Sequence, residues 1–102
     1  MRIAPVIALA LCAANSPVYA AGDAAAGRRL VMNSCSSCHA TEVATTARDA
    51  APPFSAVAKT NKERPAWIRG WLMSPHPPMP SIPLSTQQID DIIAYLSSLP
   101  TN

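Results

Sequence analysis

Two cysteines and a histidine lie within five consecutive residues, Cys35-Ser36-Ser37-Cys38-His39. Two thiols three positions apart can form a reversible disulfide, help to bind a metal ion, or add to the two vinyl groups at one edge of a haem. In the third case, the imidazole that follows the second thiol can bind the haem iron. This pentapeptide is therefore the first candidate for the chemistry of the chain.

The rest of the sequence favours haem attachment over the two other kinds of chemistry. Thiol–disulfide exchange at such a motif is expected near a βαβ pattern, and the sequence shows no strand pattern. A zinc site needs four ligands, and apart from Cys12, which lies in the leader described below, the chain adds only His76 and thioethers, which are poor zinc ligands. We therefore predict one covalently attached haem c, held by Cys35 and Cys38, with His39 as the proximal iron ligand. Thiol–disulfide exchange and zinc binding are the alternatives.

A six-coordinate haem iron needs a second axial ligand, and Met79 is the strongest candidate. It lies in residues 75–83, where five of nine residues are proline. This density excludes a helix or a central strand and predicts a rigid, extended loop. Because a thioether is a weak ligand, a stiff loop would help to hold it against displacement by water. Met73, near the end of a predicted helix, and His76, between two prolines, are the alternatives.

The first twenty residues have the pattern of a secretory signal peptide. Arg2 gives a basic start, residues 3–14 are almost entirely apolar, and small or tolerated residues precede a cleavage site after Ala20. The apolar run is too short to span a membrane, and prolines interrupt the segment. We predict that residues 1–20 are removed and that residues 21–102 form a single exported domain in the periplasm.

Length and composition fit one small domain that needs help to build its core. The chain has 102 residues, so cleavage leaves 82, too few for a catalytic domain beside a separate cofactor domain. Aromatic residues make up only 5% of the chain, and a small domain of this kind usually adds a disulfide, a metal or a cofactor. Loss of Arg2 leaves seven basic against six acidic residues, a balance that implies no nucleic-acid partner.

Two helices are predicted in the first half of the exported domain. Residues 22–34 form the first, with Asp23 as the candidate N-cap. Gly27 lies within it and costs about 1 kcal/mol relative to alanine, which indicates that another element approaches the backbone closely there. Residues 40–51 are predicted to form a loop, and residues 54–60 a short helix.

A third helix is predicted to begin at Pro65, because proline is tolerated in the first turn of a helix. Trp67 and Trp71 lie on one side of this helix together with Ile68 and Leu72. Core packing is the expected role of both tryptophans, and Trp71 is also a candidate for the wall of a haem pocket.

The last helix carries the clearest boundary signals. Ser85 and Gln88 have the spacing of a capping box, and Pro100 ends the helix. Its apolar residues form one stripe that is expected to face the core: Ile89, Ile92, Ile93, Leu96 and Leu99.

Over nearly the whole exported domain, the sequence resembles the small monohaem class I c-type cytochromes. The resemblance implies an all-α cytochrome c fold, in which three or four helices surround one covalently attached haem. It rests on five features: the Cys-Ser-Ser-Cys-His motif, Gly27 eight positions before Cys35, Pro52 thirteen positions after His39, the loop from Ser74-Pro75 to Met79-Pro80, and Tyr95-Leu96 in the last helix.

The resemblance also implies particular contacts. In the family, the first and last helices cross at the glycine matched by Gly27, which would bring Tyr95 near it. The carbonyl of the proline matched by Pro52 accepts a hydrogen bond from the proximal imidazole, here that of His39. The family pattern has a glycine before that proline, no second proline, and an aromatic in the first helix; this chain departs from it at Ala51, Pro53 and Val31.

These features predict an electron-transfer protein rather than an enzyme, with one haem c as its cofactor. A histidine and a methionine on the iron raise its potential and leave no position open for a substrate. We therefore expect a soluble periplasmic carrier of single electrons. The alternative is a haem sensor or peroxidase-like protein in which Met79 is readily displaced.

The expected partners are other exported redox proteins, such as a dehydrogenase or a terminal oxidase, with weak and transient docking. The protein is expected to act as a monomer or as a loosely associated subunit. We expect no nucleic-acid partner and no stable insertion into a membrane after cleavage. Six basic residues could steer an acidic partner: Arg28, Arg29, Lys59, Lys62, Arg64 and Arg69.

Overall fold

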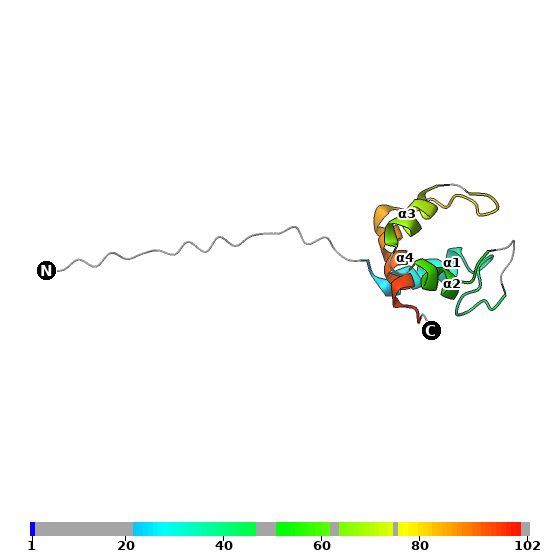
Figure 1. Cartoon of the computed structure of the whole chain (residues 1–102), viewed down its shortest axis with the longest axis horizontal. Coiled ribbons are helices and arrows are strands. Elements are labelled where there is room, and N and C mark those ends of the chain that lie inside the picture. Colours follow the sequence, from blue (N-terminus) through cyan, green and yellow to red (C-terminus); the bar gives the residue numbers. More distant parts are fainter. Residues whose placement is uncertain (2–21, 47–50, 62–63, 75, 101–102) are drawn as a thin grey trace.

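A computed structural model of the chain describes residues 1, 22–46, 51–61, 64–74 and 76–100. The predicted signal peptide, Met1 apart, lies outside the described residues. Within them are four helices, α1 (Ala24–Ser34), α2 (Phe54–Asn61), α3 (Pro65–Met73) and α4 (Thr86–Ser98), shown in Figure 1. The described residues contain no strand, only an isolated bridge between His76 and Met79. The predicted all-α fold is confirmed.

The capping signals place α1 and α4 as the sequence predicts. The Asp23 carboxylate accepts hydrogen bonds from the backbone N–H groups of Ala25 (2.9 Å) and Ala26 (3.3 Å) at the start of α1. At the start of α4, the Ser85 hydroxyl accepts from the Gln88 N–H (3.1 Å) and the Gln88 side chain accepts from the Ser85 N–H (2.8 Å). Each pair satisfies N–H groups that have no partner within the first turn of a helix.

Helices α1 and α4 lie together in Figure 1 and are in close contact, and the contact includes Gly27. A Cβ atom at position 27 would lie 1.9 Å from the backbone oxygen of Asp91, and one at Gly22 would lie 2.0 Å from that of Asp90. Only a residue without a side chain allows the two backbones to approach so closely. The crossing expected at Gly27 is therefore present.

Asp91 joins the beginning of α1 to α4. Asp91 as a residue is buried, and its carboxylate accepts hydrogen bonds from the backbone N–H of Asp23 (2.8 Å) and the side-chain amide of Gln87 (3.0 Å). These two donors, together with the positive charge of Arg29, hold the pKa of Asp91 below its usual value of 3.8. The apolar stripe of α4 does not predict this inward-facing carboxylate.

Replacing Asp91 with asparagine is expected to make the protein less sensitive to acid. Because the pKa of Asp91 is lower in the folded state, its carboxylate stabilises the fold above about pH 4, and this contribution is lost as the pH falls through the folded-state pKa. Denaturant unfolding should therefore show a deficit of Asp91→Asn relative to the parent protein at pH 6 that shrinks toward pH 2.5. A deficit that is the same at both pH values would contradict this account.

The core lies between α4 and the other three helices. Val31 is fully buried, although the family pattern favours an aromatic at its position, and Tyr95 belongs to the same buried cluster. Burial of these apolar side chains is the main force that holds α2 and α3 against α4. The described members of the cluster are Val31, Cys35, Phe54, Ala58, Ile68, Ile92, Tyr95 and Leu96.

The prediction that both tryptophans pack in the core is wrong. Trp67 is 37% exposed and Trp71 is 42% exposed, whereas Ile68 between them is buried. Both tryptophans line the cavity described below, whereas Ile68 belongs to the buried cluster as well as to the lining of that cavity. Among the described residues, no helix combines the length and the apolar character needed to cross a membrane.

Candidate haem site

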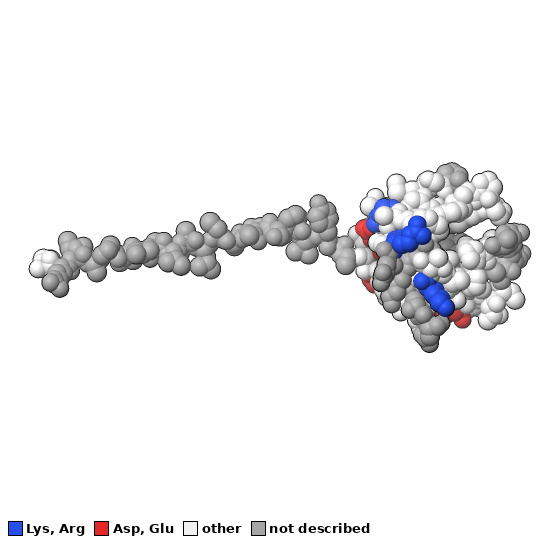
Figure 2. Space-filling view, in the orientation of Figure 1, with Lys and Arg blue, Asp and Glu red and all other residues white. Residues whose placement is uncertain are grey.

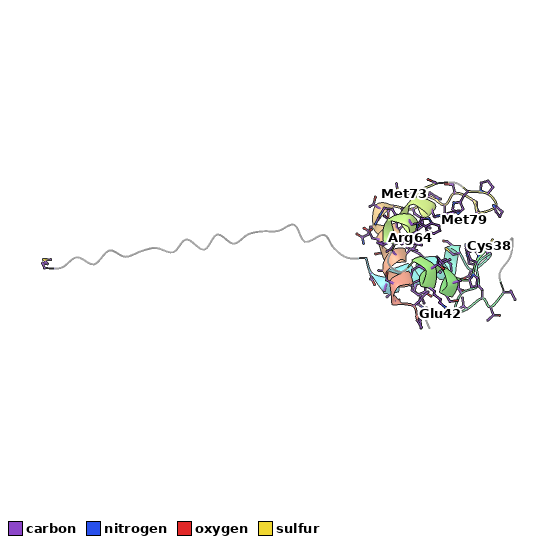
Figure 3. All side chains as sticks on the ribbon, viewed as in Figure 1. Cys38, Glu42, Arg64, Met73 and Met79 are labelled. Atoms are coloured by element: carbon purple, nitrogen blue, oxygen red, sulfur yellow. The ribbon has the colours of Figure 1, made fainter. Side chains whose placement is uncertain are left out.

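A cavity of about 400 Å³ lies between the segment after α1, helix α3, the loop after α3 and one side of α4. Figure 3 shows that Cys38 reaches this region from the segment after α1 and Met79 from the loop after α3. Its volume is in the range of pockets that hold small organic cofactors. The lining includes all six residues that the sequence assigns to the site: Cys35, Cys38, His39, Pro52, Trp71 and Met79.

The two cysteines follow α1 directly. The Cys35 N–H donates to the Val31 carbonyl (2.9 Å), so the helix leads without a break into the motif. The thiols are not joined as a disulfide. Burial raises the pKa of the Cys35 thiol to about 11, whereas a cysteine that catalyses thiol–disulfide exchange needs a lowered pKa, because the thiolate is the nucleophile. The environment of Cys35 therefore disfavours the thiol–disulfide alternative.

Two contacts orient the imidazole of His39. Its Nδ1 lies 2.6 Å from the Pro52 carbonyl oxygen, and since a carbonyl can only accept, Nδ1 carries the proton. The ring also packs against Phe54, with 4.9 Å between centroids and 48° between planes. The Phe54 N–H donates to the Ala40 carbonyl (3.0 Å), which joins the start of α2 to the cysteine segment. Nε2 is thus the nitrogen left to bind a metal. The contact with Pro52 is present although Ala51 and Pro53 differ from the family pattern.

The three candidates for the second axial ligand lie in different surroundings. Met79 is half-buried and lines the cavity, whereas Met73 is 65% exposed and is not among the residues that line it. His76 is half-buried and also lines the cavity. The geometry therefore favours Met79 over Met73 and leaves His76 as its rival. The prediction of a fully extended loop is wrong, because the Met79 N–H donates to the His76 carbonyl (3.0 Å) and closes a turn.

The residues present fit a covalently attached haem. Two thiols lie at the edge of a largely apolar cavity, and the histidine beside them presents one nitrogen while the other is held by a backbone carbonyl. A thioether lies in the facing loop. This combination of soft sulfur, imidazole and apolar surroundings is what a low-dielectric haem pocket requires.

The family profile described as Cytochrome c matches residues 24–100 of the chain. The chain therefore belongs to the cytochrome c family, which consists of electron-transfer proteins that carry covalently attached haem c. Among curated proteins, the chain is similar to cytochrome c-552 of Bradyrhizobium diazoefficiens, with 38% identity over 95 residues that cover 91% of this chain and 89% of that protein. No solved structure matches the chain.

The Cys35–His39 motif does not predict several residues that line the cavity. Phe54 follows two prolines and is the first residue of α2, but its contact with His39 depends on tertiary structure that no local sequence pattern specifies. Trp67 lines the cavity together with Trp71, and the apolar stripe of α4 contributes part of its surface to the cavity and not only to the core: Ile92 and Leu96.

Proposed function

We propose that the protein is an exported, periplasmic electron carrier whose haem iron is bound by His39 and Met79. The observation that carries the proposal is that residues far apart in the sequence line one apolar cavity, with the Nδ1 of His39 held by the Pro52 carbonyl. The signal-peptide pattern of residues 1–20 supports export. Covalent haem c is attached in exported compartments, which agrees with that pattern.

In this proposal, Cys35 and Cys38 hold the haem through thioether bonds. Because Cys35 is buried and follows α1 directly, its bond to the haem would be held in a fixed position relative to the crossing of α1 and α4. His39 binds the iron through Nε2, and the hydrogen bond to Pro52 fixes its tautomer and raises its basicity. Met79 would supply a second ligand to the iron from the loop after α3. When bound, the haem supplies a one-electron iron couple that this ligand pair shifts toward the reduced state.

The face of the protein seen in Figure 2 carries few charges among the described residues near the Met79 loop, which supports docking at that part of the surface. In the view of Figure 2, charged side chains gather over the helices, whereas described residues at the end with the Met79 loop are mostly uncharged. Arg28 is paired with Glu42 (2.6 Å) and Arg69 with Asp90. Arg64 lies over the Trp67 ring at 5.5 Å. We propose that weak, transient contacts with exported redox proteins form at this part of the surface, since redox complexes bury small interfaces.

The experiment that tests this function combines mass spectrometry with carbon monoxide binding to the exported protein. The expected mass is that of residues 21–102 plus one haem, and the reduced protein should bind carbon monoxide slowly at neutral pH because Met79 occupies the iron. Two cysteines without attached haem would remove the proposal. Rapid carbon monoxide binding by the reduced protein would instead support the sensor or peroxidase-like alternative.

A further inference from the structure

His76 joins the loop that carries Met79 to helix α3. Its ring meets the Trp71 ring edge to face, with centroids 3.9 Å apart and planes at 87°. Its Nδ1 lies 2.8 Å from the backbone oxygen of Ser74, the C-cap of α3, and must be the donor because a carbonyl can only accept. The side chain of His76 thus contacts α3 at Trp71 and the C-cap residue that follows the helix, Ser74.

The backbone of His76 extends this attachment to Met79. The Met79 N–H donates to the His76 carbonyl (3.0 Å), and Pro77 and Pro78 form the turn between them. Prolines have no N–H group, so Met79 is the one residue from 77 to 80 that can donate a backbone hydrogen bond. With so few donors, the turn depends on side-chain contacts at its ends for its position.

We infer that His76 is a positioning residue that fixes the Met79 thioether in the cavity by tethering its loop to Trp71 and Ser74. The inference rests on the proposed function, since it takes Met79 as the iron ligand. A thioether is a weak ligand, so a loop already held in place lowers the cost of keeping it bound, while a freed loop releases it more often. His76 itself does not bind the iron in this account.

The test measures how fast Met79 leaves the iron in the haem-loaded ferric protein. Imidazole is added in stopped flow at increasing concentration until the substitution rate reaches a plateau, which equals the rate of Met79 dissociation. Four variants are compared with the parent protein. His76→Phe keeps a ring beside Trp71, His76→Asn keeps a donor for the Ser74 carbonyl, His76→Ala keeps neither, and Met73→Ala is the exposed control.

We expect His76→Ala to keep the sulfur-to-iron absorption band but to raise the plateau rate about tenfold or more, because an aromatic contact and a hydrogen bond are both lost. His76→Phe and His76→Asn should each restore part of the slow exchange, and Met73→Ala should match the parent protein. Circular dichroism and denaturant unfolding of each variant separate loss of the tether from general loss of structure.

Two results would overturn the inference. If the plateau rate of imidazole substitution in His76→Ala equals that of the parent protein, the contacts of His76 do not hold Met79. The proposed function would still stand as long as the parent protein shows the sulfur-to-iron absorption band. Loss of the band in Met79→Ala would first identify Met79 as the ligand. If all three His76 variants then had a lower unfolding free energy but an unchanged exchange rate, His76 would have a purely structural role. Loss of methionine ligation in the parent protein itself would instead remove the proposed function.

Discussion

Met79→Ala is expected to lose the sulfur-to-iron charge-transfer absorption and to lower the reduction potential by on the order of 100 mV. Alanine removes the methionine sulfur from the cavity and leaves the two cysteines, His39 and the Pro52 carbonyl in place. The reduced variant should also bind carbon monoxide rapidly, because an axial position becomes accessible. Absorption spectra, redox titration and flash photolysis of the haem-loaded variant measure these three changes.

Met73→Ala is the matched control for that experiment. Met73 has the same side chain six positions earlier, but it is 65% exposed and does not line the cavity. This variant should keep the absorption band, the potential and the slow carbon monoxide reaction of the parent protein. Retention of the band in Met79→Ala and its loss in Met73→Ala would transfer the ligand role to Met73.

Gly27→Ala is expected to destabilise the protein by at least about 3 kcal/mol. The new methyl group would lie 1.9 Å from the Asp91 backbone oxygen, so α1 and α4 would have to move apart and expose part of the core. Helix propensity acts in the opposite direction, because alanine favours a helix over glycine by about 1 kcal/mol. Denaturant unfolding of the haem-loaded protein measures the net effect.

Gly70→Ala serves as the matched control, because it makes the same change in another helix. A Cβ atom at position 70 would meet nothing within 4 Å, and this residue of α3 is exposed. Propensity alone then applies, and the variant should gain roughly 0.5–1 kcal/mol. Equal stability changes in the two variants would show that the crossing does not depend on the absence of a side chain at Gly27.

Local signals in the sequence are sufficient to place the beginnings of α1, α3 and α4. Asp23 and the Ser85–Gln88 pair bind N–H groups within one turn, and Pro65 has no N–H that would need a partner, so these effects can be predicted without knowing the tertiary structure. The motif at Cys35–His39 is likewise contiguous. The likeness to class I cytochromes adds the crossing at Gly27, which no local pattern could assign to a partner.

Other features depend on how distant segments meet. The carboxylate of Asp91 is stabilised by the N–H of Asp23, 68 positions away in the chain, and periodicity within α4 cannot reveal such a donor. Trp67 and Trp71 have the spacing of core residues, but a partly exposed position beside a cavity gives the same pattern. Their placement follows from the rotation of α3 about its axis, which packing against α4 determines.

Because both tryptophans line the cavity, tryptophan fluorescence can report on the state of the haem pocket. Trp67 and Trp71 are the only tryptophans in the chain, and both line the cavity that fits the haem. A bound haem would absorb their excitation energy, so the folded protein should emit little tryptophan fluorescence. Separation of α3 from the cysteine segment would restore the emission, so that fluorescence follows the integrity of the cofactor pocket rather than helix content.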